Sequence, residues 1–265
     1  MSNQVRDEKR VEFIGSPGAG KSTTFAWALD GDLGIDRTNV IRDRLRTGAS
    51  DRLVRAISRV MPSTIAARQS YALFHRSRDF PRMYFKFAAE HPALVGLVSS
   101  FATDEIHPSV RPWRLLQKHA EMQSVHQLCW GPEAPKRNGS RAILLDEEFS
   151  QLLLLTLAAS DRADRVDTAR RYLDLVPLPA AVVAVHTPPE QCVERLQERN
   201  HGWPFLVRSK RGAEFLHRLA DAFETTITLL RERDVSLVEV DGNQSEVDQR
   251  ALLDHLRAGL ASPDR

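Results

Sequence analysis

The chain has 265 residues, a length that suits one large domain or two small ones. Its hydrophobic fraction of 42% and charged fraction of 27% are typical of a globular protein with a buried core. The net charge of +2 is too small to indicate the concentrated basic face of a nucleic-acid-binding protein, and no apolar run is long enough to cross a bilayer.

The cysteines and the first residues indicate a cellular location. Cys129 and Cys192 are the two cysteines, and they lie too far apart in the sequence to form a metal-ligand motif. Such sparse cysteine usage is typical of a reducing compartment. Residues 1–10 are polar and charged, unlike a secretory signal. We therefore expect a cytoplasmic protein that binds neither nucleic acid nor a membrane.

Apolar runs and helical patterns alternate along the chain. Short apolar runs predict buried strands at 11–14, 142–145, 180–185 and 235–240, and a further strand at 38–41. Helices are predicted at 21–29, 149–159, 190–199, 212–233 and 247–260. From about 50 to 130 the pattern is helical, and prolines at 62, 81, 92, 108 and 112 divide it into several helices.

This alternation predicts an α/β fold. Fully apolar strands that alternate with helices form a parallel sheet covered by helices on both faces. We expect a single domain, 1–265, with a helical insertion at about 50–130. In such sheets the ligand lies at the carboxyl ends of the strands. Gly15, Asp146 and His186 each follow an apolar run, so we expect them to converge at one edge.

A glycine-rich segment after the first strand matches G-x-x-x-x-G-K-[ST] at every fixed position. Glycines let backbone amides approach phosphate oxygens, and the helix that begins near Lys21 adds its N-terminal dipole. Lys21 is expected to reach the β- and γ-phosphates of ATP, and Ser22 to bind Mg²⁺. No Asn-Lys-x-Asp tetrapeptide occurs, which disfavours a Ras-type GTPase. The predicted nucleotide-binding residues are Gly15, Ser16, Pro17, Gly18, Ala19, Gly20, Lys21, Ser22 and Thr23.

Three acidic residues follow the strand at 142–145. Asp146 comes at the strand end, where it is expected to hold Mg²⁺ through water. Glu147 is a candidate general base toward an acceptor hydroxyl, although an acidic first helical turn is an equally good explanation. Glu148 is expected to be a solvated helix cap.

Arginines gather after the strand at 180–185. Arg195 and Arg199 are four residues apart and share one helix face, and Arg208 follows a loop with glycine and proline. We expect a lid at about 195–212 whose cations neutralise a transferring phosphoryl group. An ordinary charged helix surface with local glutamate pairing is the alternative.

Taken together, these segments resemble the P-loop nucleoside and nucleotide kinases, nearest to thymidylate kinase-like and deoxynucleoside kinase-like proteins. The resemblance covers 11–29, 142–155 and 180–260. It implies phosphoryl transfer from ATP to a small-molecule acceptor bound among helices beside the sheet: a nucleoside, nucleotide, sugar or metabolite. Thymidylate kinases carry Asp-Arg where this chain has Asp146-Glu147. The catalytic residues predicted in this way are Lys21, Asp146, Glu147, Arg195, Arg199 and Arg208.

Other interpretations stay open. A nucleotide-dependent ATPase or switch would use the insertion at 50–130 as a docking surface for a partner. A sulfotransferase shares the fold, but the complete Gly-Lys-Ser loop disfavours it. A homodimer is compatible with the sequence. The aromatic residues Phe74, Phe80, Tyr84, Phe85 and Phe87 are either core or an acceptor-binding surface.

Overall fold

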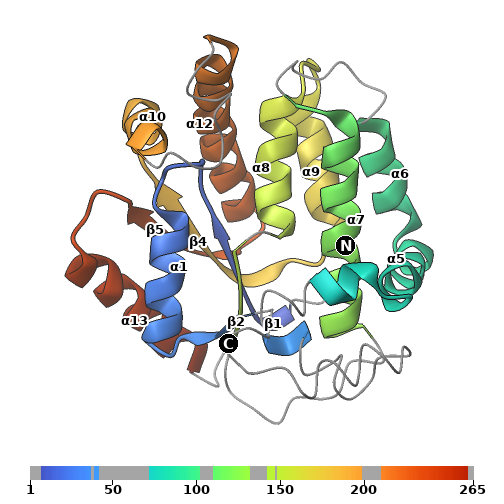
Figure 1. Ribbon diagram of the computed structural model, residues 1–265, viewed down its shortest axis with the longest axis horizontal. Helices are drawn as coiled ribbons and strands as arrows, with labels where there is room; N and C mark the ends of the chain where they lie inside the picture. Colours follow the sequence, from blue (N-terminus) through green and yellow to red (C-terminus); the bar gives the residue numbers. More distant parts are fainter. Residues whose placement is uncertain are drawn as a thin grey trace.

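The computed structural model describes residues 7–36, 39–41, 72–101, 110–131, 142–146, 148–198 and 210–261. Within them, one five-stranded sheet crosses the molecule (Figure 1). The strands lie in the order β2-β3-β1-β4-β5, and every neighbouring pair is parallel. Their bounds are β1 (Asp7–Ile14), β2 (Gly34–Asp36), β3 (Ala142–Leu145), β4 (Pro179–His186) and β5 (Ser236–Asp241).

Helices connect and cover the strands. Their bounds are α1 (Lys21–Asp30), α5 (Asp79–Glu90), α6 (Pro92–Phe101), α7 (Pro112–Trp130), α8 (Phe149–Ala159), α9 (Arg165–Leu175), α10 (Pro189–Glu198), α12 (Lys210–Arg231) and α13 (Glu246–Ala261). None of the helices in the described part of the chain is long and apolar enough to span a membrane.

Alternate residues of the central strands face opposite helix layers. Val11 and Phe13 pack with α1 and α13 on one face. Ile14 and Val182 pack with α8, α9 and α12 on the other, and α5 and α7 cover Ile143 of β3. Strand β3 and most of β4 are buried on both faces, which is why these strands are apolar, whereas β1 also carries charged residues such as Arg10 and Glu12. The predicted α/β fold, a parallel sheet with helices on both faces, is confirmed.

The second strand lies earlier than the apolar pattern indicates. The prediction of a strand at 38–41 is wrong, because residues 39–41 are helical and β2 is Gly34–Asp36. Val40 and Ile41 are buried against α5 and α7 instead of in the sheet. A Cβ at Gly34 would lie 2.5 Å from the carbonyl oxygen of Ala142, so this glycine permits the close approach of β3.

The described part of the insertion is helical, as predicted. Pro92 and Pro112 are the first residues of α6 and α7, where a helix needs no backbone donor. Pro81 lies in the first turn of α5, directly after the break at residues 77–78 that separates α5 from a helical segment at 72–76. Helix α9 is not among the predicted elements, because only a narrow stripe of this arginine-rich segment is apolar, with Ala169 and Tyr172 buried.

Candidate functional site

Strands β1 and β3 are neighbours whose following helices leave on opposite faces of the sheet. Helix α1, after β1, packs on one face, and α8, after β3, packs on the other. The place where two neighbouring strands send their following helices to opposite faces is called a switch point. Ligands of open α/β sheets bind there, beyond the carboxyl ends of the strands. The glycine loop (residues 15–22) follows β1 and Asp146 follows β3, so the switch point is the candidate site.

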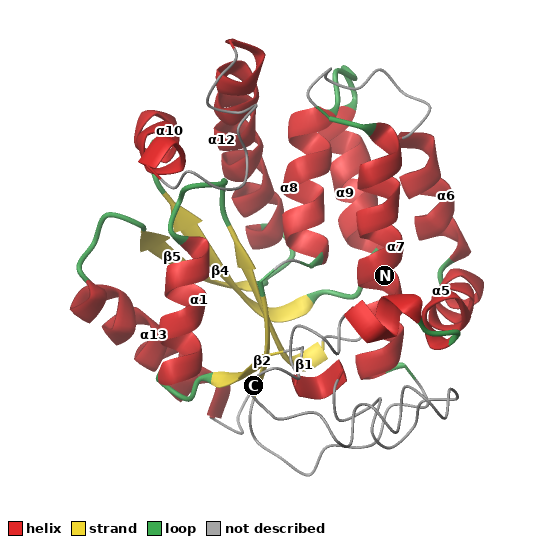
Figure 2. Cartoon of the chain, viewed as in Figure 1, coloured by secondary structure: helices red, strands yellow, loops and turns green. Residues whose placement is uncertain are grey.

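The glycine loop turns tightly between β1 and α1, where Figure 2 draws it in green. Gly18 and Gly20 have φ angles of +88° and +98°, in the left-handed region that other residues avoid. The amide of Ala19 donates to Ser16 O at 3.0 Å, and that of Thr23 to Gly20 O at 2.9 Å. Left-handed residues in such a turn direct successive amides to one side, as in anion-binding nests.

Two neighbouring segments pack closely against the glycine loop. A Cβ at Gly18 would lie 2.6 Å from the carbonyl oxygen of Cys192 on α10, and a Cβ at Gly242 would lie 2.1 Å from Ala19 O. Burial raises the pKa of the Cys192 thiol to about 11, with Arg195 opposing the shift. The thiol is therefore protonated at neutral pH and serves packing and not nucleophilic chemistry.

Arg195 holds the glycine loop to the turn after β5. One end of its guanidinium, Nη1, donates to Gly18 O at 3.3 Å and to Ala19 O at 3.4 Å. The other end, Nη2, donates to Gly242 O at 3.1 Å and to Asn243 Oδ1 at 2.8 Å. The structure thus gives this arginine a positioning contact with the loop carbonyls, which the sequence pattern did not indicate.

Lys21 and Asp146 meet across the switch point. The ammonium group of Lys21 donates to the backbone oxygen of Asp146 at 2.6 Å and forms an ion pair with its carboxylate Oδ1. Their side chains are 13% and 37% exposed, so the pair is partly shielded and remains open to solvent. Two predicted residues that are 125 positions apart in the sequence are therefore brought into direct contact.

The side chains at this point suit a magnesium ion. Among the described residues the Ser22 hydroxyl makes no hydrogen bond, and it lies exposed in the first turn of α1. A hydroxyl and a carboxylate are the hard oxygen ligands that Mg²⁺ prefers, with phosphates and waters filling the other positions. No group of three or more His, Cys, Asp or Glu with metal-binding geometry occurs in the described part of the chain, so a site made of protein ligands alone is not present there.

A hydrogen bond also joins the glycine loop to the segment that follows β3. The amide of Gly15 donates to the side-chain oxygen of Gln151 at 3.0 Å, in a buried contact between the end of β1 and the first turn of α8. The sequence pattern includes Gln151 only as part of the resemblance to kinases. The contact itself spans 136 positions of the chain, so no local pattern could have indicated it.

No protein-family model matches the sequence, and no curated protein compared with it matches either. The residues predicted to bind nucleotide lie together in the glycine loop and the first turn of α1. Glu147, Arg199 and Arg208 lie outside the residues that the structure describes.

A buried ion pair fixes the start of α8. Arg10 and Glu12 of β1 are fully buried, with Arg10 Nε 3.3 Å from Glu12 Oε1. The arginine also donates to Pro177 O and lies 5.6 Å from the ring centroid of Trp130. Glu12 Oε2 accepts the backbone amide of Ser150 at 2.8 Å, so this carboxylate caps the helix. Opposite charges two residues apart, and so on the same face of a strand, are the signal that could have revealed the pair.

The prediction that Glu148 is a solvated cap is wrong. It stands at the N-cap position of α8, but its side chain is buried and makes no capping hydrogen bond, since Glu12 supplies the cap. Burial raises the pKa of Tyr172 well above its ordinary value, and the charges of Glu12 and Glu148 add to the shift. A cluster of buried charge thus lies directly behind the switch point.

The aromatic residues of the insertion are largely core. Phe74 and Phe87 are fully buried, and Phe87 packs against the ring of Phe149 at 6.0 Å. Phe85 is the exception, because it is exposed on α5. The interpretation of this group as core is therefore confirmed for Phe74 and Phe87.

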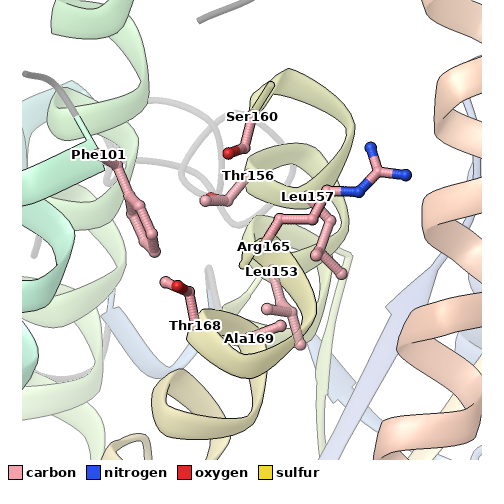
Figure 3. A pocket seen from close by; sticks show the side chains of 8 residues that line it. All are labelled: Phe101, Leu153, Thr156, Leu157, Ser160, Arg165, Thr168 and Ala169. Carbon is pink, nitrogen blue, oxygen red and sulfur yellow. The ribbon is translucent and has the colours of Figure 1, made fainter. Parts of the chain in front are cut away.

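A hollow between α6, α8 and α9 lies away from the glycine loop. Figure 3 shows its lining: Phe101, Leu153, Thr156, Leu157, Ser160, Arg165, Thr168 and Ala169. Ser160 lies nine positions beyond Gln151, or about 13 Å along the chain at helical rise. The guanidinium of Arg165 points away from Phe101 and Thr168. The hollow is lined mainly by apolar groups and hydroxyls, and it contributes nothing to the switch point.

Proposed function

We propose that the protein is a phosphotransferase that uses ATP and Mg²⁺ and moves the γ-phosphoryl group to a small-molecule acceptor. The observation that carries this proposal is the contact between Lys21 and Asp146. A complete G-x-x-x-x-G-K-[ST] loop and an acid at the end of the neighbouring strand are the parts that phosphoryl transfer needs in one place. The kinase-like resemblance of the sequence points to the same reaction.

In this proposal the amides of the glycine loop and the ammonium group of Lys21 bind the phosphates of ATP. Lys21 exchanges the Asp146 carboxylate for phosphate oxygens when nucleotide binds, so its charge lies where negative charge develops. Ser22 and Asp146 hold Mg²⁺, which when bound neutralises charge on the β- and γ-phosphates. The buried pair of Arg10 and Glu12 keeps the two segments in register behind the site.

The transfer itself involves one bond made and one broken. An acceptor oxygen attacks the γ-phosphorus, the bond to the β,γ-bridging oxygen breaks, and ADP leaves with that electron pair. We assign Glu147 to receive the proton of an acceptor hydroxyl, and Arg199 and Arg208 to neutralise the transferring group. Arg195 would have to leave its carbonyl partners to do the same, so positioning the loop is its better-supported role.

The acceptor is a hydroxyl or phosphate oxygen of a nucleoside, nucleotide, sugar or other metabolite. The test is ADP release from MgATP with a panel of such compounds, measured for wild type, for Lys21→Ala and for Lys118→Ala. Lys118 is a matched control, because it is a lysine on α7 that is 47% exposed and lies 3.4 Å from Glu121, away from the glycine loop. We expect one class of acceptor to stimulate release, and Lys21→Ala to lower the stimulated rate at least about a hundredfold.

Two outcomes would overturn the proposal. If ATP binds but no compound stimulates its slow turnover, an ATPase or switch that regulates a partner is the better description. If Lys21→Ala turns over ATP as fast as the Lys118→Ala control, the glycine loop is not the catalytic site.

A further inference from the structure

Gln151 is a buried polar residue at the switch point whose hydrogen bonding is half complete. Its side chain is 5% exposed and lies in the first turn of α8. Among the described residues it makes one hydrogen bond, in which Oε1 accepts the amide of Gly15 at 3.0 Å. Its Nε2 has no partner among the described residues and is not one of the atoms that are enclosed without one, so its two N–H donors are open to water or to a ligand at the switch point.

The bond to Gly15 also decides how the amide group is oriented. A backbone N–H can donate only to the oxygen of a carboxamide, so the NH₂ group must face away from Gly15. The first turn of α8 that carries Gln151 is itself fixed, because Glu12 caps the amide of Ser150 at 2.8 Å. The donor pair of Gln151 is therefore pre-oriented beside the first residue of the glycine loop.

Gln151 reaches the switch point from the face opposite α1. The glycine loop and Lys21 continue into α1, which packs on one face of the sheet, whereas α8 packs on the face that α5 and α7 also cover. If the loop and Lys21 hold the donor nucleotide, a ligand group that meets Gln151 belongs to the compound on the other face. That compound is the phosphoryl acceptor.

We propose that Gln151 determines acceptor specificity: its Nε2 amide donates a hydrogen bond to an oxygen of the phosphoryl acceptor, while its Oε1 stays bound to Gly15. The inference rests on the proposed phosphotransferase function. It restricts the acceptor to a compound that presents a hydroxyl, carbonyl or phosphate oxygen beside the reacting group. It also makes acceptor binding sensitive to the position of the glycine loop, because one side chain contacts both.

The test compares three variants with wild type in acceptor-stimulated ADP release, using each compound of the nucleoside, nucleoside monophosphate and sugar panel as the probe. Gln151→Met removes both hydrogen bonds without adding charge. Gln151→Glu keeps an oxygen for Gly15 but loses the donors. Gln117→Met is the control, since Gln117 is exposed on α7 and bonds to Glu121 at 3.0 Å.

We expect Gln151→Met to raise the acceptor KM about tenfold and to raise the ATP KM less, because the nucleotide loop loses only the bond from Gly15 and keeps its other contacts. For Gln151→Glu the acceptor KM should fall as the pH is lowered from about 8 to about 5.5, because a protonated carboxyl regains a donor. Wild type and Gln117→Met should show no such trend. A purely structural role for Gln151 does not produce this pH profile.

The failures are distinguishable. If wild type responds to no acceptor, the proposed function fails and the inference fails with it. If wild type responds but the acceptor KM of Gln151→Met is unchanged, the inference alone is wrong. If the ATP KM rises and the acceptor KM does not, the donor pair serves the nucleotide, and acceptor specificity lies elsewhere.

Discussion

Replacing Gly18 by alanine tests whether the glycine loop is shaped by backbone conformation and close packing together. Gly18 has a φ of +88°, and an added Cβ would lie 2.6 Å from the carbonyl oxygen and 3.0 Å from the Cα of Cys192. The contact atoms are backbone of α10, which cannot rotate away as a side chain would. Alanine at this position therefore meets two independent penalties.

The two penalties, one from backbone conformation and one from packing, add in the free energy of unfolding. An L-residue in the left-handed region costs roughly 1–2 kcal/mol. Forcing an extra methyl group into a filled space costs about 1–3 kcal/mol. The sum, about 2–5 kcal/mol, is a large fraction of the 5–15 kcal/mol by which a typical domain is stable. We expect Gly18→Ala to fold with a clearly reduced free energy of unfolding and to bind nucleotide weakly.

Two other glycines separate the contributions. Gly20 has a φ of +98°, but the nearest atom to an added Cβ is Arg195 Nη1 at 3.7 Å, so Gly20→Ala should cost only about 1–2 kcal/mol. Gly96 lies exposed in α6 with nothing within 4 Å of an added Cβ, so Gly96→Ala should stabilise by about 0.5–1 kcal/mol.

Urea denaturation followed by circular dichroism gives the three free energies of unfolding, and trinitrophenyl-ATP fluorescence gives nucleotide binding. If Gly18→Ala is no less stable than Gly20→Ala, α10 yields to the methyl group and close packing is not what requires glycine. If neither variant is less stable than wild type, the reasoning from left-handed backbone is refuted.

Three further predictions concern residues around the site. Burial lowers the pKa of His119 from 6.5 to about 3, so the unfolded chain binds a proton that the folded chain does not, and stability should fall as the pH drops from about 6.5 toward 3. His119→Gln should flatten this slope by up to about 1.4 kcal/mol per pH unit in urea denaturation series, and an unchanged slope would contradict the assignment. Arg10→Leu leaves Glu12 buried without its partner and should lower the free energy of unfolding by about 3–5 kcal/mol. The double variant Arg10→Leu/Glu12→Leu should recover much of this loss. If Arg10→Leu is as stable as wild type, the pair is dispensable. Arg195→Ala should weaken trinitrophenyl-ATP binding about tenfold, whereas Arg170→Ala on the exposed surface of α9 should not change it.

Most elements of the sheet could be predicted from local patterns. Strands β1 and β3, which precede Gly15 and Asp146, contain short apolar runs. The glycine loop has a residue spacing that local chemistry explains. Strand β2 was misplaced because its three residues include a glycine and an aspartate, and because Val40 and Ile41 form a more apolar run nearby. Apolarity alone does not distinguish burial in a sheet from burial against helices.

Charged residues inside the fold were harder to predict. Arg10 and Glu12 lie within β1, which begins with charged residues, and Glu148 follows two other acids in what resembles a solvated helix start. Each is buried because partners from distant segments surround it, such as Pro177 and Trp130 around Arg10. A charged residue in a sequence is expected to be exposed unless a partner for its charge is known. Such a partner can lie far away in the sequence, and only the folded structure shows which residue it is.

The sequence by itself determined the alternation of strands and helices, the parallel sheet, and the glycine loop with Lys21 at its end. Those features depend on periodicity and on residues within one turn or strand, which a local pattern contains. Only the tertiary structure decided that Lys21 meets Asp146, that Gln151 binds the amide of Gly15, and that Arg195 holds the loop carbonyls. These contacts join positions 125, 136 and 177 residues apart, and packing of the two helix layers onto one sheet is what brings them within hydrogen-bonding distance.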